Sequence, residues 1–273
     1  ASSRRLSRHS LARLVAALKG KPSYRQPIVG LVRGLTGPIT ELNMGQTAEV
    51  VGHLFGITRA QSDAYAAESH RRLAKAQSEG WLKGEVETSF ARDGKFYDHD
   101  DGVRPDSTPE SLARLKPVFE RPWGKVTAGN SSQITDGASW VILASEEAVA
   151  KYGLTPKAVI LDSQWSALDP GIMGGYASAA LDPKVMGLGP VLSATELLKR
   201  NELTLSDIET WELNEAFATQ VLGCLAAWND EKFCKEILGL EGAAGELDQT
   251  RLNVDGGAIS LGHPVGCSGN RIV

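Results

Sequence analysis

The stretch Asn253-Val-Asp-Gly-Gly-Ala-Ile-Ser-Leu-Gly-His-Pro-Val-Gly-Cys-Ser-Gly-Asn-Arg271 places a single histidine, His263, among five glycines. Glycine allows backbone dihedrals and close ligand approaches that a Cβ atom would prevent. The apolar run 258–261 is predicted to be a buried strand, and residues 268–271 are predicted to begin a helix. His263 would then lie in a turn between two rigid elements, where catalytic side chains are often held.

The bulk composition is that of an ordinary globular protein of 273 residues and 29.2 kDa, enough for one large or two modest domains. The net charge of −4 disfavours general nucleic-acid binding, so no nucleic acid is expected as a partner. No apolar run is long enough to span a membrane, and no signal-peptide pattern stands at the start. Three cysteines without a CxxC pair favour a reducing compartment. The predicted location is the bacterial cytoplasm, with the mitochondrion as the alternative.

Both ends of the chain are unusual. It opens at Ala1 rather than at Met, and it stops at Val273 within the apolar start of a predicted helix. A helix ending there buries little apolar surface. We therefore expect the sequence to be part of a longer protein.

Residues 4–21 predict a basic amphipathic helix, with leucines at helical spacing and arginines between them. Such a helix either makes a peripheral membrane contact, docks on a partner protein, or covers its own domain.

A separate feature is a near repeat, in which the sequence of residues 167–174 recurs in similar form at 180–187. A local duplication that enlarges one loop is the simplest interpretation.

Strand and helix signals alternate from Gly124 onward. Strands are predicted at 125–127, 138–143 and 159–161, and helices at 146–152 and 194–201. Alternation of this kind predicts an α/β fold, with a mainly parallel sheet and helices on its faces.

The other histidines predict no metal site. His9 and His53 lack carboxylate or cysteine neighbours at ligand spacing, and His99 lies in an acidic turn that we expect to be solvated. His70 stands next to two arginines, so it is also expected to be solvated. It falls within a long helix predicted to open with a capping box at Thr58–Gln61 and to end at Gly80.

The segment around His263 resembles the histidine motif of the thiolases, Asn-x-x-Gly-Gly-Ala-Ile-x-x-Gly-His-Pro-x-Gly-x-(Ser/Thr)-Gly-x-Arg. Four further segments resemble thiolases in the same order, and together they cover nearly the whole chain. They are Met44–Val51 with Gly56–Arg59, Val103–Pro105 with Leu112–Phe119, Gly124–Ser132 with Thr135–Ala138, and Asp182–Pro190 with Asn214–Ala218. The most similar branch is the 3-ketoacyl-CoA thiolases of fatty-acid β-oxidation.

This resemblance implies an acyltransferase that cleaves 3-ketoacyl-CoA with CoA, or runs the reverse Claisen condensation, through an acyl-cysteine. It makes His263 the base that activates the cysteine and Asn214 the holder of an oxyanion-site water. It assigns Arg104 to the adenine or phosphate end of CoA and Ser132 to the pantetheine. It also assigns a thioester channel to four apolar side chains, for which a plain core role is the alternative: Met44, Phe119, Met186 and Phe217. Coenzyme A enters as a substrate, and no permanently bound cofactor or metal is implied.

Thiolases also need a nucleophilic cysteine in their N-terminal half and a second cysteine near the C-terminus, and neither motif occurs in this sequence. Cys224 and Cys234 are expected to be buried structural thiols, and Cys267 stands where the family motif usually has alanine. The chain alone is therefore predicted to be inactive. The alternative is a non-catalytic CoA-binding or scaffold remnant of a thiolase.

The fold implied by the resemblance is the layered α/β/α/β/α thiolase fold, present in part. Residues 1–120 would form the loop domain, and residues 121–273 most of the C-terminal half. A large apolar face should then remain uncovered. The implied partners are acyl-CoA, CoA and further copies in a homodimer or homotetramer, with the α-subunit of a β-oxidation complex as another candidate.

Overall fold

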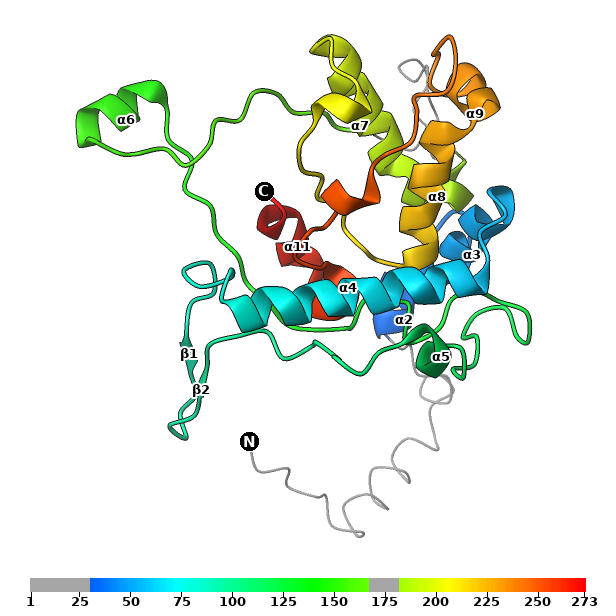
Figure 1. The fold of residues 1–273 in the computed structure, drawn as a ribbon, viewed down its shortest axis with the longest axis horizontal. Coiled ribbons are helices and arrows are strands. Elements are labelled where there is room, and N and C mark those ends of the chain that lie inside the picture. Colours follow the sequence, from blue (N-terminus) through cyan, green and yellow to red (C-terminus); the bar gives the residue numbers. More distant parts are fainter. Residues whose placement is uncertain (1–29, 167–181) are drawn as a thin grey trace, which may run out of the picture. The chain divides into compact units, whose positions relative to one another are not determined.

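The computed structural model describes residues 30–166 and 182–273 (Figure 1). The chain divides into two compact units, Ala1–Asn43 and Met44–Val273. The helix predicted at 4–21 and most of the 167–187 near repeat lie outside the described residues. In the first unit, α2 (Gly30–Gly34) precedes a turn in which Gly37 N–H donates to the Leu42 carbonyl at 2.8 Å.

The second unit is mainly helical in its described residues, and its strands form one short antiparallel hairpin of β1 (Ser89–Phe90) and β2 (Phe96–Tyr97). Its α-helices are α3 (Met44–Leu54), α4 (Arg59–Glu79), α5 (Pro109–Leu112), α6 (Glu146–Tyr152), α7 (Gly189–Arg200), α8 (Ala218–Asn229), α9 (Glu231–Glu236), α10 (Ala258–Leu261) and α11 (Val265–Arg271). The 3₁₀ turns are η2 (Pro183–Leu188), η3 (Leu205–Asp207) and η4 (Gln249–Arg251).

Helix α4 confirms the predicted capping signals. The Thr58 hydroxyl accepts the Gln61 N–H, and the Gln61 side chain accepts the Thr58 N–H, so both members of the capping box are present. Gly80 ends the helix in the left-handed region at φ 73°. These signals are local in sequence, which is why the helix could be predicted.

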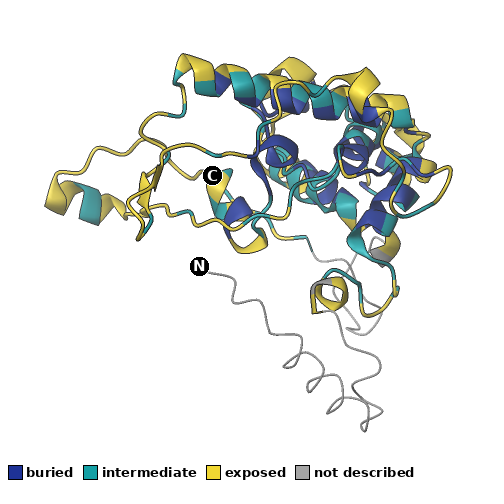
Figure 2. Cartoon of the chain, turned by 90° about the horizontal axis from the view of Figure 1, so that it is seen from below, coloured by how far each residue is buried: buried dark blue, intermediate teal, exposed yellow. Residues whose placement is uncertain are grey.

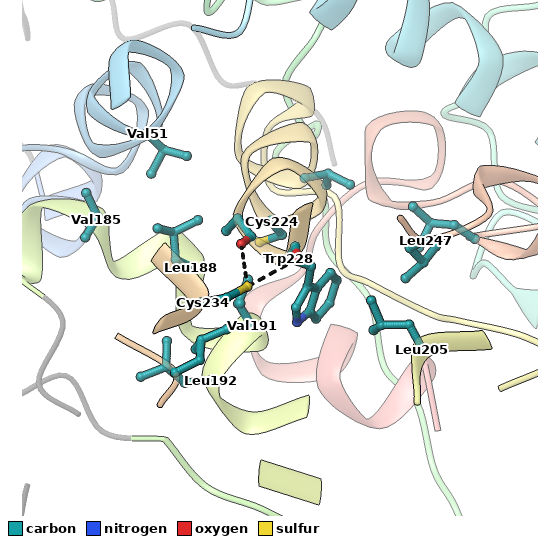
Figure 3. Close-up of a cluster of buried hydrophobic side chains, with 14 residues drawn as sticks. Val51, Val185, Leu188, Val191, Leu192, Leu205, Cys224, Trp228, Cys234 and Leu247 are labelled. Atoms are coloured by element: carbon teal, nitrogen blue, oxygen red, sulfur yellow. Dashed lines mark hydrogen bonds between the residues drawn. The ribbon is translucent and has the colours of Figure 1, made fainter. Parts of the chain in front are cut away.

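The main apolar core lies among α3, η2, α7, α8 and α9 (Figure 3). Its centre is Trp228, whose indole N–H donates to the Thr195 hydroxyl at 3.1 Å. The Cys234 thiol lies against the carbonyls of Ala227 and Trp228. A smaller cluster links α4, α5, α8 and α10 through Ala66, Leu112, Ala218 and Ile259.

The three strands predicted at 125–127, 138–143 and 159–161 are wrong for the described residues, where the β1–β2 hairpin accounts for every strand. A strand requires a neighbouring edge to satisfy its backbone groups. In the first segment, the N–H groups of Lys125 and Val126 donate to the Glu49 carboxylate instead.

The second and third of these segments form an exposed apolar stretch on either side of α6 (Figure 2). Trp140 is 86% exposed and Leu161 is 87% exposed, and Ile142 is comparably open to solvent. These exposed apolar residues lie along extended segments, and the expected uncovered apolar face stays a prediction. Large exposed apolar surfaces of this kind usually mark contact with another part of a structure.

The prediction of a strand at 258–261 is also wrong, because these residues form α10. The backbone makes helical hydrogen bonds to residues four positions earlier: Leu261 N–H donates to the Gly257 carbonyl at 2.9 Å, and Gly262 N–H donates to the Ala258 carbonyl at 2.8 Å. All four residues are buried, as expected. Residues 268–271 are helical as predicted, but they end a helix rather than begin one, because α11 spans Val265–Arg271.

Candidate active site

His263 lies in the turn between α10 and α11, and its hydrogen bonds define its tautomer. Ser268 Oγ lies 2.7 Å from His263 Nδ1 and 3.2 Å from the Pro264 carbonyl, and the side-chain nitrogen of Asn214, which can only donate, faces Nε2. Nε2 then carries the lone pair. The Asn214 amide nitrogen lies 3.4 Å from Nε2 and is oriented to donate to it. The structure therefore brings together the two residues predicted to be catalytic.

Partial burial lowers the pKa of His263 below its usual value. A neutral imidazole with its lone pair on Nε2 is the state that a general base requires. Burial and the Ser268 contact thus prepare the same nitrogen for accepting a proton.

The segment that carries Asn214 is held from two sides. Asn253 holds the preceding residue, with its Oδ1 accepting Leu213 N–H and its Nδ2 donating to the Leu213 carbonyl, both at 2.8 Å. On the other side, Ser132 N–H donates to the Ala216 carbonyl at 3.0 Å. Ser132 is therefore placed next to the Asn214 segment by its backbone.

Glu215 is a structural centre of the site that sequence reasoning missed. The residue is 1% exposed, and its carboxylate accepts four hydrogen bonds. The donors are Tyr65 Oη at 2.9 Å, Ser69 Oγ at 2.7 Å, Asn253 Nδ2 at 2.9 Å and Ile259 N at 3.2 Å. Its place directly after Asn214 was the signal that could have suggested a supporting role.

Gln133 is a second residue that was missed. Its backbone carbonyl accepts His263 N–H at 3.0 Å, and its side-chain amide donates to the Gly102 carbonyl at 2.7 Å. Gln133 follows Ser132 directly. It therefore connects the loop before Arg104, the Ser132 segment and the His263 turn.

Arg104 is anchored through its backbone, whereas its side chain is exposed. Its N–H donates to Nδ1 of His70 at 3.1 Å. The expectation that His70 is solvated is wrong, because the residue is 3% exposed on the inner face of α4. Burial, and next the charge of Arg104, lower the pKa of His70 to about 4. The helical register, rather than the adjacent arginines, decides where His70 points.

The four residues predicted to line the thioester channel lie on three separate parts of the second unit. Met44 begins α3, where the Phe119 ring covers the neighbouring Gly45 so closely that a Cβ there would lie 1.9 Å from it. Phe217 is the half-buried N-cap of α8 and bridges to Ser131. Met186 is 40% exposed on η2, which packs against α3 and α8. Phe217 is therefore close to the Ser132 segment, and Met44 is close to Phe119.

The three thiols are buried, which agrees with the structural role expected for Cys224 and Cys234. Burial raises the pKa of Cys224 to about 12 and also raises that of Cys234. A thiol needs a lowered pKa to be a good nucleophile near neutral pH. Cys267 is 7% exposed in α11, and its sulfur packs toward Gly137.

One group of side chains in the described residues has metal-ligand proximity: Glu49, His53 and Glu120. The expectation that His53 lacks a carboxylate neighbour is wrong, because its Nε2 lies 2.7 Å from Glu120 Oε2. Lys125 Nζ donates to His53 Nδ1 at 3.0 Å, so Nε2 carries the hydrogen and donates to Glu120. Glu49 accepts backbone N–H groups. These atoms are already satisfied by protein partners.

A pocket of about 460 Å³ lies at the end of α4, bounded by the turn after Gly80 and by residues 98–100. None of the predicted site residues lines it. Over residues 30–166 and 182–273, no helix has the length and apolar character needed to cross a membrane.

Two family models match this chain. The thiolase N-terminal domain covers residues 5–147, and the thiolase C-terminal domain covers residues 170–273. The chain belongs to the thiolase family. Among curated thiolases, it is 42% identical over 233 residues to the 3-ketoacyl-CoA thiolase of Aeromonas hydrophila, covering 84% of this chain and 53% of that protein. The 3-ketoacyl-CoA thiolase of Colwellia psychrerythraea is 40% identical over 234 residues, with the same coverage.

Solved thiolase structures share the fold. The human mitochondrial 3-ketoacyl-CoA thiolase in complex with CoA has a TM-score of 0.72 at 35% identity, covering 90% of this chain and 56% of that one. The dimeric peroxisomal thiolase of Saccharomyces cerevisiae has a TM-score of 0.71 at 31% identity, covering 93% and 54%. The predicted thiolase fold, present in part, is confirmed. The chain spans about half the length of the thiolases that it matches.

Proposed function

We propose that this chain forms part of a thiolase that cleaves 3-ketoacyl-CoA with CoA. The products are acetyl-CoA and an acyl-CoA shortened by two carbons, and the reverse condensation uses the same groups. The observation that carries the proposal is the pairing of the His263 Nε2 lone pair with the Asn214 amide at 3.4 Å. The names and CoA complex of the related thiolases give further support.

In the proposed reaction, His263 Nε2 takes the proton of a cysteine thiol, and the thiolate attacks the 3-keto carbon. The bond between C2 and C3 breaks, the acyl group stays on sulfur, and acetyl-CoA leaves as its enolate, which takes a proton from the second cysteine that thiolases need near the C-terminus. That cysteine regains a proton from the thiol of CoA, and the CoA thiolate attacks the acyl-cysteine. The shortened acyl-CoA is released, and the cysteine thiolate that leaves takes back its proton from His263. Protonated His263 and a water on Asn214 lie where the thioester oxygen gains charge, and each such donor is typically worth about 3–4 kcal/mol.

The nucleophile in this proposal is a cysteine other than Cys224, Cys234 and Cys267. The first two have raised pKa values because of burial, and Cys267 packs toward Gly137. We propose that CoA binds along Ser132, with Arg104 at the adenine or phosphate end. The apolar side chains of Met44, Phe119, Met186 and Phe217 would line the thioester channel.

The test compares the native protein with the 273-residue chain. Iodoacetamide should label one cysteine of the native protein that is none of the three described, and acyl-CoA should protect it. Replacement of His263 by alanine should abolish thiolysis of acetoacetyl-CoA. The 273-residue chain alone should bind CoA in calorimetry but turn over no substrate. Robust thiolysis by this chain would refute the assignment of the nucleophile, and absence of CoA binding to either protein would refute the function.

The relatives also suggest the setting of the protein. We propose a homodimer, in line with the dimeric peroxisomal thiolase, with a homotetramer and a β-oxidation α-subunit as alternatives for size measurements to separate. We propose a bacterial cytoplasmic location, which the bacterial relatives support, with the mitochondrion as the alternative in view of the human mitochondrial thiolase. Residues 4–21 would decide whether the assembly contacts a membrane. Vesicle flotation of a variant with Arg4, Arg5 and Arg8 replaced by alanine would test that contact.

A further inference from the structure

We propose that Glu215 is the positioning residue that holds Asn214 and His263 in register with each other. It touches neither the imidazole nor a reacting atom, and acts through the two segments that carry the pair. The catalytic meaning of the pair rests on the proposed function, whereas the positioning itself does not.

The two oxygens of the Glu215 carboxylate serve different segments. Oε1 accepts from Tyr65 Oη and from Asn253 Nδ2, both at 2.9 Å. Asn253 in turn holds both backbone polar groups of Leu213, so this side fixes the segment that leads into Asn214. Oε2 accepts from Ser69 Oγ at 2.7 Å and from Ile259 N at 3.2 Å.

The Oε2 side leads to the histidine. Ile259 lies in α10, which ends at Leu261, two residues before His263. Its N–H is among the first of that short helix and has no intrahelical acceptor, so Glu215 supplies the missing acceptor. The carboxylate therefore fixes the N-terminus of α10, and the length of α10 determines the position of His263 in the turn that follows.

Glu215 is buried, and the loop that contains Gly256 and Gly257 packs closely around it. A Cβ at Gly257 would lie 2.3 Å from the Glu215 Cδ atom, so only glycine lets the loop approach the carboxylate. Gly256 has φ 88°, and a Cβ there would lie 2.8 Å from the Ser69 carbonyl. The paired glycines of the motif thus serve the approach of this loop to Glu215 and to α4.

Helix α4 provides the fixed base for this arrangement. Tyr65 and Ser69 lie one turn apart on the same face, and each donates to one oxygen of Glu215. Ser69 Oγ also accepts Gly257 N–H at 3.2 Å and contacts Ser260 Oγ at 3.0 Å. The segment that carries Asn214 and the segment that carries His263 are therefore both held against helix α4 through the Glu215 carboxylate.

The informative substitution is Glu215→Gln, which preserves size but replaces one acceptor oxygen by an amide donor. With the amide toward Oε2, it faces the Ile259 N–H, and with the amide toward Oε1, it faces the Asn253 Nδ2 group. Either orientation sets two N–H donors against each other. The matched control is Thr195→Val, which removes a buried hydrogen bond to Trp228 in the main core.

The readout is the NMR titration of the His263 imidazole in the ¹³C-histidine-labelled chain, assigned with His263→Gln. In Glu215→Gln, the midpoint should move by about half a unit or more toward the ordinary value near 6.5, because the turn opens to solvent. Thr195→Val should keep the wild-type midpoint. The proposal is overturned if Glu215→Gln keeps the wild-type midpoint, or if Thr195→Val shifts it equally.

Two further arms keep the test decisive. If Glu215→Gln does not fold, Ser69→Ala removes one donor of the Oε2 side, and an unchanged His263 midpoint in that variant overturns the proposal. In the native protein, Glu215→Gln should lower kcat about 10-fold or more with little change in KM, since misplaced catalytic groups cost rate. Absence of turnover in the wild-type protein, together with a shifted midpoint, would refute the proposed function but leave the positioning role intact.

Discussion

Replacement of His70 by asparagine should remove a large part of the acid sensitivity of this protein. His70 is 3% exposed and accepts the Arg104 N–H at Nδ1. An asparagine side chain can offer its Oδ1 as acceptor there but does not titrate. The substitution therefore separates the hydrogen bond from the protonation.

The magnitude follows from the pKa of His70, which burial and the Arg104 charge lower from 6.5 to about 4 in the folded protein. The folded state favours the neutral ring, so its stabilising contribution is complete above pH 6.5 and is lost as the pH falls toward 4. The full difference corresponds to about 3 kcal/mol, of which about 2 kcal/mol should be lost between pH 7 and pH 5.

The assay is urea unfolding at pH 7 and pH 5 for the wild type, His70→Asn and His99→Asn. The His99 imidazole is 65% exposed, so this variant is a control with the same substitution at a solvated site. The free energy of unfolding of the wild type and of His99→Asn should fall by about 2 kcal/mol more than that of His70→Asn. Other titrating groups are shared by all three chains and cancel in the comparison. A parallel loss in all three would refute the reasoning.

Three further outcomes are expected. Asn214→Ala should lower kcat of the native protein by about 10²–10³-fold while leaving its melting temperature nearly unchanged, and an equal loss of folding would contradict an oxyanion role. Cys224, whose pKa burial raises to about 12, should resist iodoacetamide at pH 8 until the chain is unfolded in urea, and rapid labelling of the folded chain would show that it is accessible. Gly257→Ala should lower the free energy of unfolding by about 1–3 kcal/mol or more, because its Cβ would collide with Glu215. The control Gly266→Ala should be neutral or stabilising, since Gly266 lies in α11 with open space around it. Equal effects of the two substitutions would argue against the close approach of Gly257 to Glu215.

The features that the sequence predicted correctly depend on neighbours within a few residues. The capping box at Thr58, the stop at Gly80 and the helix at 146–152 are examples, because each is decided by hydrogen bonds that span only three or four positions. The histidine motif likewise identified the family from local sequence, since its glycines and His263 stand at fixed spacings.

The tertiary structure decided what depends on distant partners. Glu215 is joined to Ser69 across 146 positions of sequence, and Ser69 to Ser260 across 191, so no local pattern could indicate that network. His70 looked solvated beside two arginines, yet the register of α4 turns it inward. The apolar run at 258–261 could be buried as strand or helix, and the Glu215 carboxylate at Ile259 N–H favours the helix.

The predicted strands at 138–143 and 159–161 also show that a local sequence pattern does not decide strand pairing. Their apolar, β-branched sequence determines a preference for burial, but pairing requires an adjacent edge, and the described residues supply none for them. The sequence by itself therefore determined the family, the local helix signals and the choice of Asn214 and His263 as the pair that we propose to be catalytic. Only the tertiary structure decided how that pair is held, because buried carboxylates and backbone ladders obtain their partners through space.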